Sequence, residues 1–176
     1  MRTTRRRLGA LFAGAALATT ALLATGTAPA QAYGPNPKVS AYYRDTAHCP
    51  CSGGTLTDPF DGTYFAKDPG GYAVKLELNQ GGSFIGKVEF HPNDERLWVY
   101  DTKNDGDAFY VHLSYTAGGT THNLGTYTAP GTTAVLDKLV KDFDIPEGAG
   151  VDISVYDDPA LTDYIGGARG TAGAVA

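Results

Sequence analysis

Apolar residues take every second position along the middle of this chain. Within 72–78, and again within 84–90, charged residues such as Lys75 and Glu89 stand between them, and Gly81-Gly82 separates the two runs. A period of two indicates a strand with one buried side and one solvent-facing side, and a short glycine turn between two such runs indicates an antiparallel hairpin. The same reasoning predicts further strands over 38–44, 97–100, 109–115, 120–127 and 151–156.

The pattern over Ala134–Phe143 fits two structures. Its apolar residues recur at helical spacing, which favours a short helix, whereas Leu139, Phe143 and Ile145 also suit a strand that ends at Pro146. Seven or eight short strands without alternating helices predict an all-β fold. We expect a single antiparallel β-sandwich with at most one short helix.

Glycine and proline residues divide the chain into four parts. Residues 1–32 are expected to be a cleaved leader, and 33–62 a flexible N-terminal segment that carries a Cys-Pro-Cys loop. Residues 63–168 are expected to form the β-sandwich domain, and 169–176 a flexible tail of small residues.

The first 32 residues have the composition of a secretory signal peptide. Arginines precede an apolar run, Leu8–Ala24, and Ala30-Gln31-Ala32 has the small residues after which signal peptidase cuts. The run is too short and too rich in Ala and Gly for a membrane anchor. We therefore expect a secreted protein, cleaved after Ala32, whose mature chain begins at Tyr33. Arg5-Arg6-Arg7 leaves twin-arginine export open beside general secretion, which the pattern favours.

Removal of this leader makes the chain more acidic. The leader carries four of the 14 Lys and Arg residues and none of the 19 Asp and Glu residues, so the formal charge changes from −5 to −9. Such a surface is repelled by phosphate backbones and by anionic lipid headgroups. We therefore expect the protein to bind neither nucleic acid nor, after cleavage, a membrane. We also expect it to be a monomer.

The only two cysteines, Cys49 and Cys51, flank Pro50. In an oxidising compartment we expect a disulfide between them, and because it closes a very small loop it contributes little through chain entropy. With His48 the pair could instead bind a soft metal or take part in redox chemistry. Against this, Cys-x-Cys differs by one residue from the redox motif and offers zinc at most three ligands.

From Gly86 onward the chain carries four short phrases that resemble a known group of proteins: Val88–Phe90, Leu97–Gly106 (LWVYDTKNDG), Asp144–Gly148 and Val151–Asp157. The group consists of small exported actinobacterial β-sandwich proteins of unknown function. The resemblance implies a compact antiparallel β-sandwich and a strand over 139–145, and it implies no activity. Members carry cysteines near the positions of Tyr100 and Tyr156, so the cross-strand disulfides of the group are absent here.

Residues 101–107 (DTKNDGD) hold a candidate metal site. Asp101, Asp105 and Asp107 supply the oxygen ligands that Ca²⁺ prefers, and Gly106 can bend the chain. Lys103, however, occupies a ligand position of the EF-hand pattern, and Asn, Asp and Gly also tolerate the left-handed conformations of a hairpin turn. A calcium site and a plain turn both stay open, and the turn is favoured. No other cofactor is expected.

No catalytic signature is present in the sequence. His91, His112 and His122 fall in or beside separate predicted strands, and no Gly-x-Ser-x-Gly elbow occurs. Glu77 and Glu89 could face each other across a hairpin as a glycosidase pair does. Solvent-facing charges on strands are far commoner, so we expect these glutamates to be exposed.

The 11 tyrosines and Trp98 could line a sugar-binding face, or they could pack within the sheet. The leading hypothesis is a secreted, non-catalytic module that binds an extracellular protein or a polysaccharide. An inhibitor of a secreted enzyme that inserts its Cys49–Cys51 loop is the second hypothesis. A secreted hydrolase is the third.

Overall fold

The computed structural model describes residues 33–53, 56, 58, 62–129, 136–170 and 173–176. This part of the chain is all-β and contains no helix, so the prediction of an all-β fold is confirmed. Its strands are β1 (Lys38–Asp45), β2 (Cys51–Ser52), β3 (Tyr64–Phe65), β4 (Tyr72–Gln80), β5 (Ser83–His91), β6 (Arg96–Asp101), β7 (Tyr110–Ala117), β8 (Thr120–Tyr127), β9 (Asp137–Asp142), β10 (Gly150–Tyr156), β11 (Tyr164–Ala168) and β12 (Ala174–Val175).

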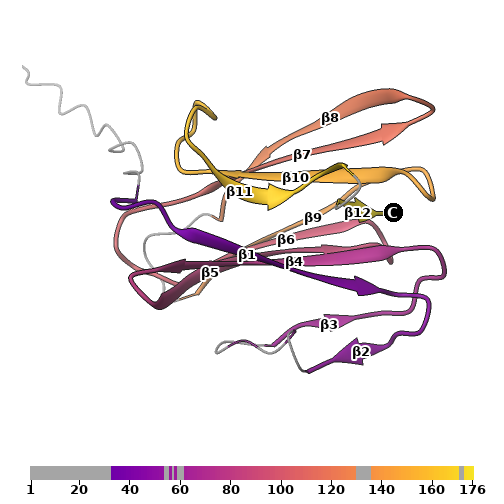
Figure 1. The fold of residues 1–176 in the computed structure, drawn as a ribbon, viewed down its shortest axis with the longest axis horizontal. Coiled ribbons are helices and arrows are strands. Elements are labelled where there is room, and N and C mark those ends of the chain that lie inside the picture. The colour runs from indigo at the N-terminus through magenta and orange to yellow at the C-terminus, as the bar shows by residue number, and fades with distance from the viewer. Residues whose placement is uncertain (1–32, 54–55, 57, 59–61, 130–135, 171–172) are drawn as a thin grey trace, which may run out of the picture.

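Ten of these strands form one antiparallel sheet that curls on itself (Figure 1). Its main path runs β8-β7-β10-β12-β4-β5-β6-β9, while β1 also pairs with β4 and β11 with β10. The sheet therefore has two halves, β8-β7-β10-β11 and β1-β4-β5-β6-β9, which the short strand β12 joins. Strands β2 and β3 pair with each other outside this sheet, below β4 in Figure 1.

The core lies between the two halves of the curled sheet. On β4 and β5 the alternating residues Val74, Leu76, Leu78, Val88 and Phe90 are fully buried, as their spacing predicts. They belong to the same cluster as the inward residues of β7 and β10. Each such side chain contributes about 1.5–3 kcal/mol when it is removed from water, so this cluster is the main source of stability.

The opposite side of the β4–β5–β6 layer is also covered, which the sequence did not indicate. A second, smaller cluster of Cys49, Leu56, Phe65 and Ala73 lies there: β4 itself supplies Ala73, β3 supplies Phe65, and Cys51 of β2 packs against the cluster. The expectation that the strand charges face solvent is therefore wrong for Lys75, Lys87 and Glu89, all of which are buried.

The segment that the pattern left ambiguous is a strand where the structure describes it. Strand β9 pairs with β6 and sets Trp98 opposite Val140 and Tyr100 opposite Lys138. Residues 134–135 lie outside the described residues. The helix that the spacing favoured is wrong for 137–142 because β6 offers this segment a free edge with which to form hydrogen bonds.

Both ends of the described chain are fixed to the sheet. Tyr33 is 3% exposed and Ala176 1% exposed, so neither is part of a flexible lead-in or tail. The C-terminal residues form β12 between β10 and β4, and their small size suits this place: a Cβ on Gly173 would lie 2.5 Å from the carbonyl oxygen of Val151. Residues 173–176 are held here by hydrogen bonds to other parts of the chain.

Candidate functional site

A cleft of about 370 Å³ opens on the covered side of β5 and β6. Its floor comes from β5 and β6, one wall comes from β3 and the residues on either side of it, and the turn between β5 and β6 closes one end. The described residues that line it are Gly62, Thr63, Tyr64, Phe65, Ala66, Glu89, His91, Pro92, Asn93, Asp94, Arg96, Trp98 and Tyr100.

Strand register places the floor residues side by side. Glu89 lies opposite Trp98 and His91 opposite Arg96 across the β5–β6 pair. Because successive side chains of a strand alternate between its faces, these four and Tyr100 all point to the side opposite the main core. The floor of the cleft is therefore a polar and aromatic surface.

The aromatic rings of the wall and the floor form a chain of contacts. The centroids of Phe65 and His91 lie 4.8 Å apart, those of His91 and Trp98 5.5 Å apart, and those of Trp98 and Tyr100 6.0 Å apart. The ammonium of Lys138 lies 4.9 Å from the centroid of Trp98. At the wall, Tyr64 is 59% exposed, so the cleft offers a ligand a free aromatic ring.

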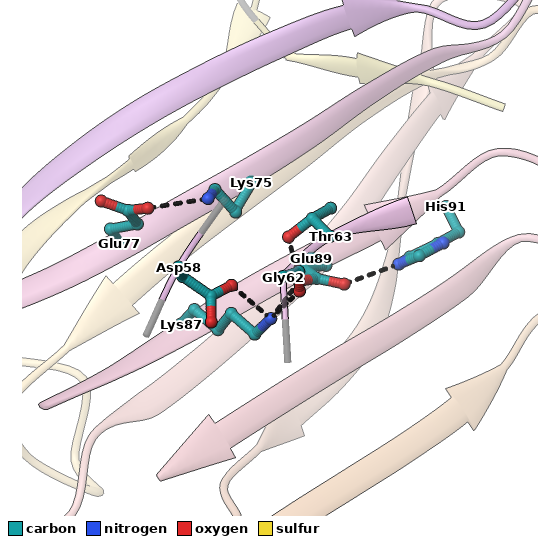
Figure 2. A network of polar contacts seen from close by, with 8 residues as sticks. All are labelled: Asp58, Gly62, Thr63, Lys75, Glu77, Lys87, Glu89 and His91. Carbon is teal, nitrogen blue, oxygen red and sulfur yellow. Dashed lines mark hydrogen bonds and ion pairs between the residues drawn. The ribbon is translucent and has the colours of Figure 1, made fainter. Parts of the chain in front are cut away.

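A buried ionic network that includes Glu89 and His91 lies beside these rings, and Figure 2 shows it. The Lys87 ammonium donates to Asp58 Oδ2 at 2.7 Å and to the carbonyl oxygen of Gly62 at 2.6 Å, and it lies 2.7 Å from Glu89 Oε1. Thr63 also donates to Glu89 Oε1, at 2.7 Å. Lys87 and Glu89 therefore tie the segment before β3, which forms one wall of the cleft, to the floor.

Glu89 also orients His91, whose Nε2 lies 2.9 Å from Glu89 Oε2. Burial acts to raise the pKa of Glu89, but hydrogen bonds from His91, Lys87 and Thr63, together with the charge of Lys87, outweigh it. The pKa of Glu89 is therefore below its usual range. A glutamate that stays ionised, with both oxygens engaged, positions its neighbours and is unsuited to act as a general acid.

Two further groups in the cleft bear on binding. Trp98 lines it, and its indole N–H is buried without a hydrogen-bond partner in the described part of the chain. A donor that stays unpaired in this way costs about 1–3 kcal/mol. Arg96, at the rim, pairs with Asp142 at 2.6 Å and with Asp94 at 3.4 Å.

The aspartates proposed for calcium serve a turn in this structure. Asp101 Oδ1 accepts a hydrogen bond from the backbone N–H of Lys103 at 2.9 Å, and Asp105 Oδ1 accepts one from that of Asp107 at 3.2 Å. Gly106 has a positive φ of 88°. Within the described ranges, no three His, Cys, Asp or Glu residues are grouped so that they could hold a metal ion.

Cys49 and Cys51 are within bonding distance, with their sulfur atoms 1.99 Å apart. Cys51 lies opposite Phe65 in the β2–β3 pair, and Cys49 packs in the same small cluster as Phe65. The cysteine pair therefore braces one wall of the cleft. Its neighbour His48 is exposed.

The other pairings weighed from sequence are not formed. Each of the two glutamates faces a lysine across the β4–β5 hairpin, with Glu77 opposite Lys87 and Lys75 opposite Glu89. The glycosidase-like pairing of the glutamates is therefore wrong. His112 and His122 lie on the β7–β8 hairpin, on the other half of the sheet from His91.

Sequence reasoning missed Lys87, Thr63 and Tyr64 as site residues. One signal was available: Lys87, Glu89 and His91 occupy alternate positions of one strand, directly before the strand that carries Trp98. The segment that covers this face of β5 gave no such signal, because residues 45–62 have the composition of an irregular loop.

Comparisons with protein families, with curated proteins and with solved structures found no match. The resemblance to small exported actinobacterial proteins stays a prediction. In the part of the chain that the structure describes, no helix is long and apolar enough to cross a membrane.

Proposed function

We propose that this protein is an exported, non-catalytic module that binds a saccharide in the cleft over β5 and β6. The observation that carries the proposal is the cleft itself. Its wall has an exposed aromatic ring, Tyr64, and its floor joins Trp98 and His91 beside the buried ionic network of Lys87 and Glu89. Concave sites with aromatic linings and a few fixed polar groups are typical of small-ligand binding.

The size and charge of the cleft favour a neutral, polar ligand. Its volume of about 370 Å³ is near the lower end of the range for small-molecule sites, roughly 300–1,000 Å³. Lys87 lies between Glu89 and Asp58, and Arg96 between Asp142 and Asp94, so neither cation is free to select an anionic ligand. A sugar ring offers an apolar face to an aromatic side chain and hydroxyl groups to His91, Asn93 and Asp94.

Export supports this proposal. The leader-like composition of residues 1–32 and the acidic remainder suit a monomer that acts outside the cell, where polysaccharides are abundant. On this basis we propose that the partner is a polysaccharide of the cell surface or its surroundings, and that the chain acts after cleavage at Ala32.

The proposal can be tested with intrinsic fluorescence because Trp98 is the only tryptophan in the chain. Soluble oligosaccharides of glucose and of N-acetylglucosamine are titrated against the mature protein, and emission and heat of binding are recorded. We expect a shift in Trp98 emission. Tyr64→Ala should weaken binding roughly tenfold, equal to about 1.4 kcal/mol. Tyr164→Ala, which removes a 44% exposed ring on β11 far from the cleft, is the matched control and should bind normally.

A hydrolase is the second candidate, and the contact of His91 with Glu89 at 2.9 Å favours it. In that reading His91 would act as a general base on a water molecule in the cleft. The same oligosaccharides, incubated with the protein and assayed for new reducing ends, separate the two functions. Turnover that His91→Ala abolishes would replace the binding proposal. Binding of secreted proteins but of no oligosaccharide would assign the cleft to a protein partner instead.

A further inference from the structure

The backbone nitrogen of Tyr33 is held inside the protein. Its N–H donates to Asp157 Oδ1 at 3.0 Å, and both residues are buried, with exposed fractions of 3% and 1%. The second oxygen, Asp157 Oδ2, is buried without a hydrogen-bond partner in the described part of the chain. The site therefore has a free acceptor beside a nitrogen that offers it only one hydrogen.

The charges around this nitrogen are negative. Those that act most on Asp157 are the carboxylates of Asp163, Asp107 and Asp158. Burial, followed by such repulsion, raises the pKa of Asp157 to about 6, and burial with neighbouring carboxylates raises that of Asp101 to about 6. Burial, followed by the carboxylates at 101, 105, 107 and 157, also raises the pKa of the Tyr33 phenol. Among the described residues, the charges that act most on these groups are therefore carboxylates.

We propose that Asp157 is a binding site for the free α-ammonium of Tyr33, created when the leader is removed. The inference rests on the export part of the proposed function, because Ala30-Gln31-Ala32 places the cut before Tyr33. Hydrolysis of the Ala32–Tyr33 peptide bond by a signal endopeptidase consumes one water. It leaves a carboxylate on Ala32 and an ammonium on Tyr33.

Cleavage changes this nitrogen in two ways. A neutral amide with one hydrogen becomes a cation with three, so it can donate to both oxygens of Asp157. The new charge also offsets the repulsion among the carboxylates, because a buried charge is tolerated when it is paired and hydrogen-bonded. The segment that follows is already fixed by Asn36, which donates to Asp163 at 2.8 Å, and by Gln80, which donates to the carbonyl oxygen of Pro35 at 2.7 Å. Processing thus completes the fold at its N-terminus.

The test compares two N-termini in two backgrounds. One protein begins at Tyr33 and the other carries one extra alanine before it, each with Asp157 or with Asp157→Asn. We expect the chain that begins at Tyr33 to melt several degrees higher than the extended chain, and we expect this difference to vanish in Asp157→Asn. Asp94→Asn, which removes an exposed carboxylate at the cleft rim, is the matched control and should keep the difference.

Acylation of the N-terminal amine gives a second measurement that does not depend on comparing melting curves. The folded protein should react slowly at Tyr33 and quickly in Asp157→Asn. Equal melting temperatures for the two N-termini, or equal acylation rates with and without Asp157, would overturn the inference. So would a Ca²⁺-dependent rise in melting temperature of the extended chain as large as the effect of the free terminus, because the cluster would then bind a metal.

Neither measurement involves the cleft, so a failure of saccharide binding would leave this result intact. Mass spectrometry of the exported protein tests the shared premise: a mature N-terminus other than Tyr33 would overturn the inference while leaving saccharide binding untouched.

Discussion

Lys87 shows how this protein holds a charge away from water. The side chain is 1% exposed, and acceptors from Asp58, Gly62 and Glu89 surround its ammonium within 2.7 Å. The ring of Tyr100 lies below it, with its centroid at 4.5 Å. A buried ammonium is tolerated only while these partners stay in place, so the network is stable as a whole and vulnerable at each member.

Glu89→Gln should therefore destabilise the protein strongly. It removes the carboxylate on which Lys87 and His91 both depend and leaves a buried cation poorly compensated. We expect a loss of about 3–5 kcal/mol in the free energy of unfolding, measured by urea denaturation. Asp142→Asn is the matched control: it breaks the pair with Arg96, but Asp142 is 68% exposed, and such pairs contribute about 1 kcal/mol or less. Similar losses for the two variants would contradict this account of the network.

At the level of elements, the sequence predicts strands whose two sides differ in polarity. Strands β4, β5 and β7 alternate between core and outward residues, and each was predicted. Strand β12 could not be predicted, because two small residues carry no periodicity and its pairing is set by β10 and β4. The cleft was missed for the same reason: its wall is built on β3, two residues long within a loop-like stretch.

Truncation after Gly173 tests whether the C-terminal residues are structural. The backbone of Ala176 forms two hydrogen bonds, donating to the carbonyl oxygen of Ala149 at 3.1 Å and accepting from the N–H of Gly148 at 2.7 Å. Because β12 also joins the two halves of the sheet, we expect its removal to lower the stability by roughly 2–4 kcal/mol, at about 1 kcal/mol for each hydrogen bond lost. Thermal melting measures this loss. In the intact chain, slow amide hydrogen exchange at Ala176 should accompany it, and fast exchange with an unchanged melting temperature would show that the tail is dispensable.

At the scale of the whole molecule, the two regions described above handle charge in opposite ways. In the cleft, Lys87 and Glu89 compensate each other, and the pKa of Glu89 is held below its usual range. At the N-terminus, Asp101 and Asp157 are buried among like charges, and the pKa of each is raised to about 6. Ionisation of Glu89 therefore stabilises the folded state, whereas ionisation of Asp101 and Asp157 destabilises it.

The second region should dominate the pH dependence of stability above pH 5. Between its ordinary pKa of 3.8 and about 6, each of these aspartates binds more protons in the folded state than in the unfolded state. Stability from this source is therefore present below about pH 4 and is lost as the pH rises through about 6. Burial is the largest cause of both raised pKa values, and the neighbours that add to it are carboxylates at 105, 107 and 137 for Asp101, and at 107, 158 and 163 for Asp157.

Urea unfolding from pH 4.5 to pH 7 measures this loss. Asp101→Asn combined with Asp157→Asn is the reference, since groups outside this acidic cluster titrate alike in both proteins. The chain extended by one alanine should lose stability relative to the reference as the pH rises. The chain that begins at Tyr33 should lose less, because its ammonium lowers the pKa of Asp157. Above about pH 8 that advantage should fade as the ammonium, with an ordinary pKa of about 7.7–8.0, loses its proton. Stability that rises relative to the reference between pH 4.5 and pH 7 in the extended chain would show that these carboxylates are compensated by charges other than the N-terminus.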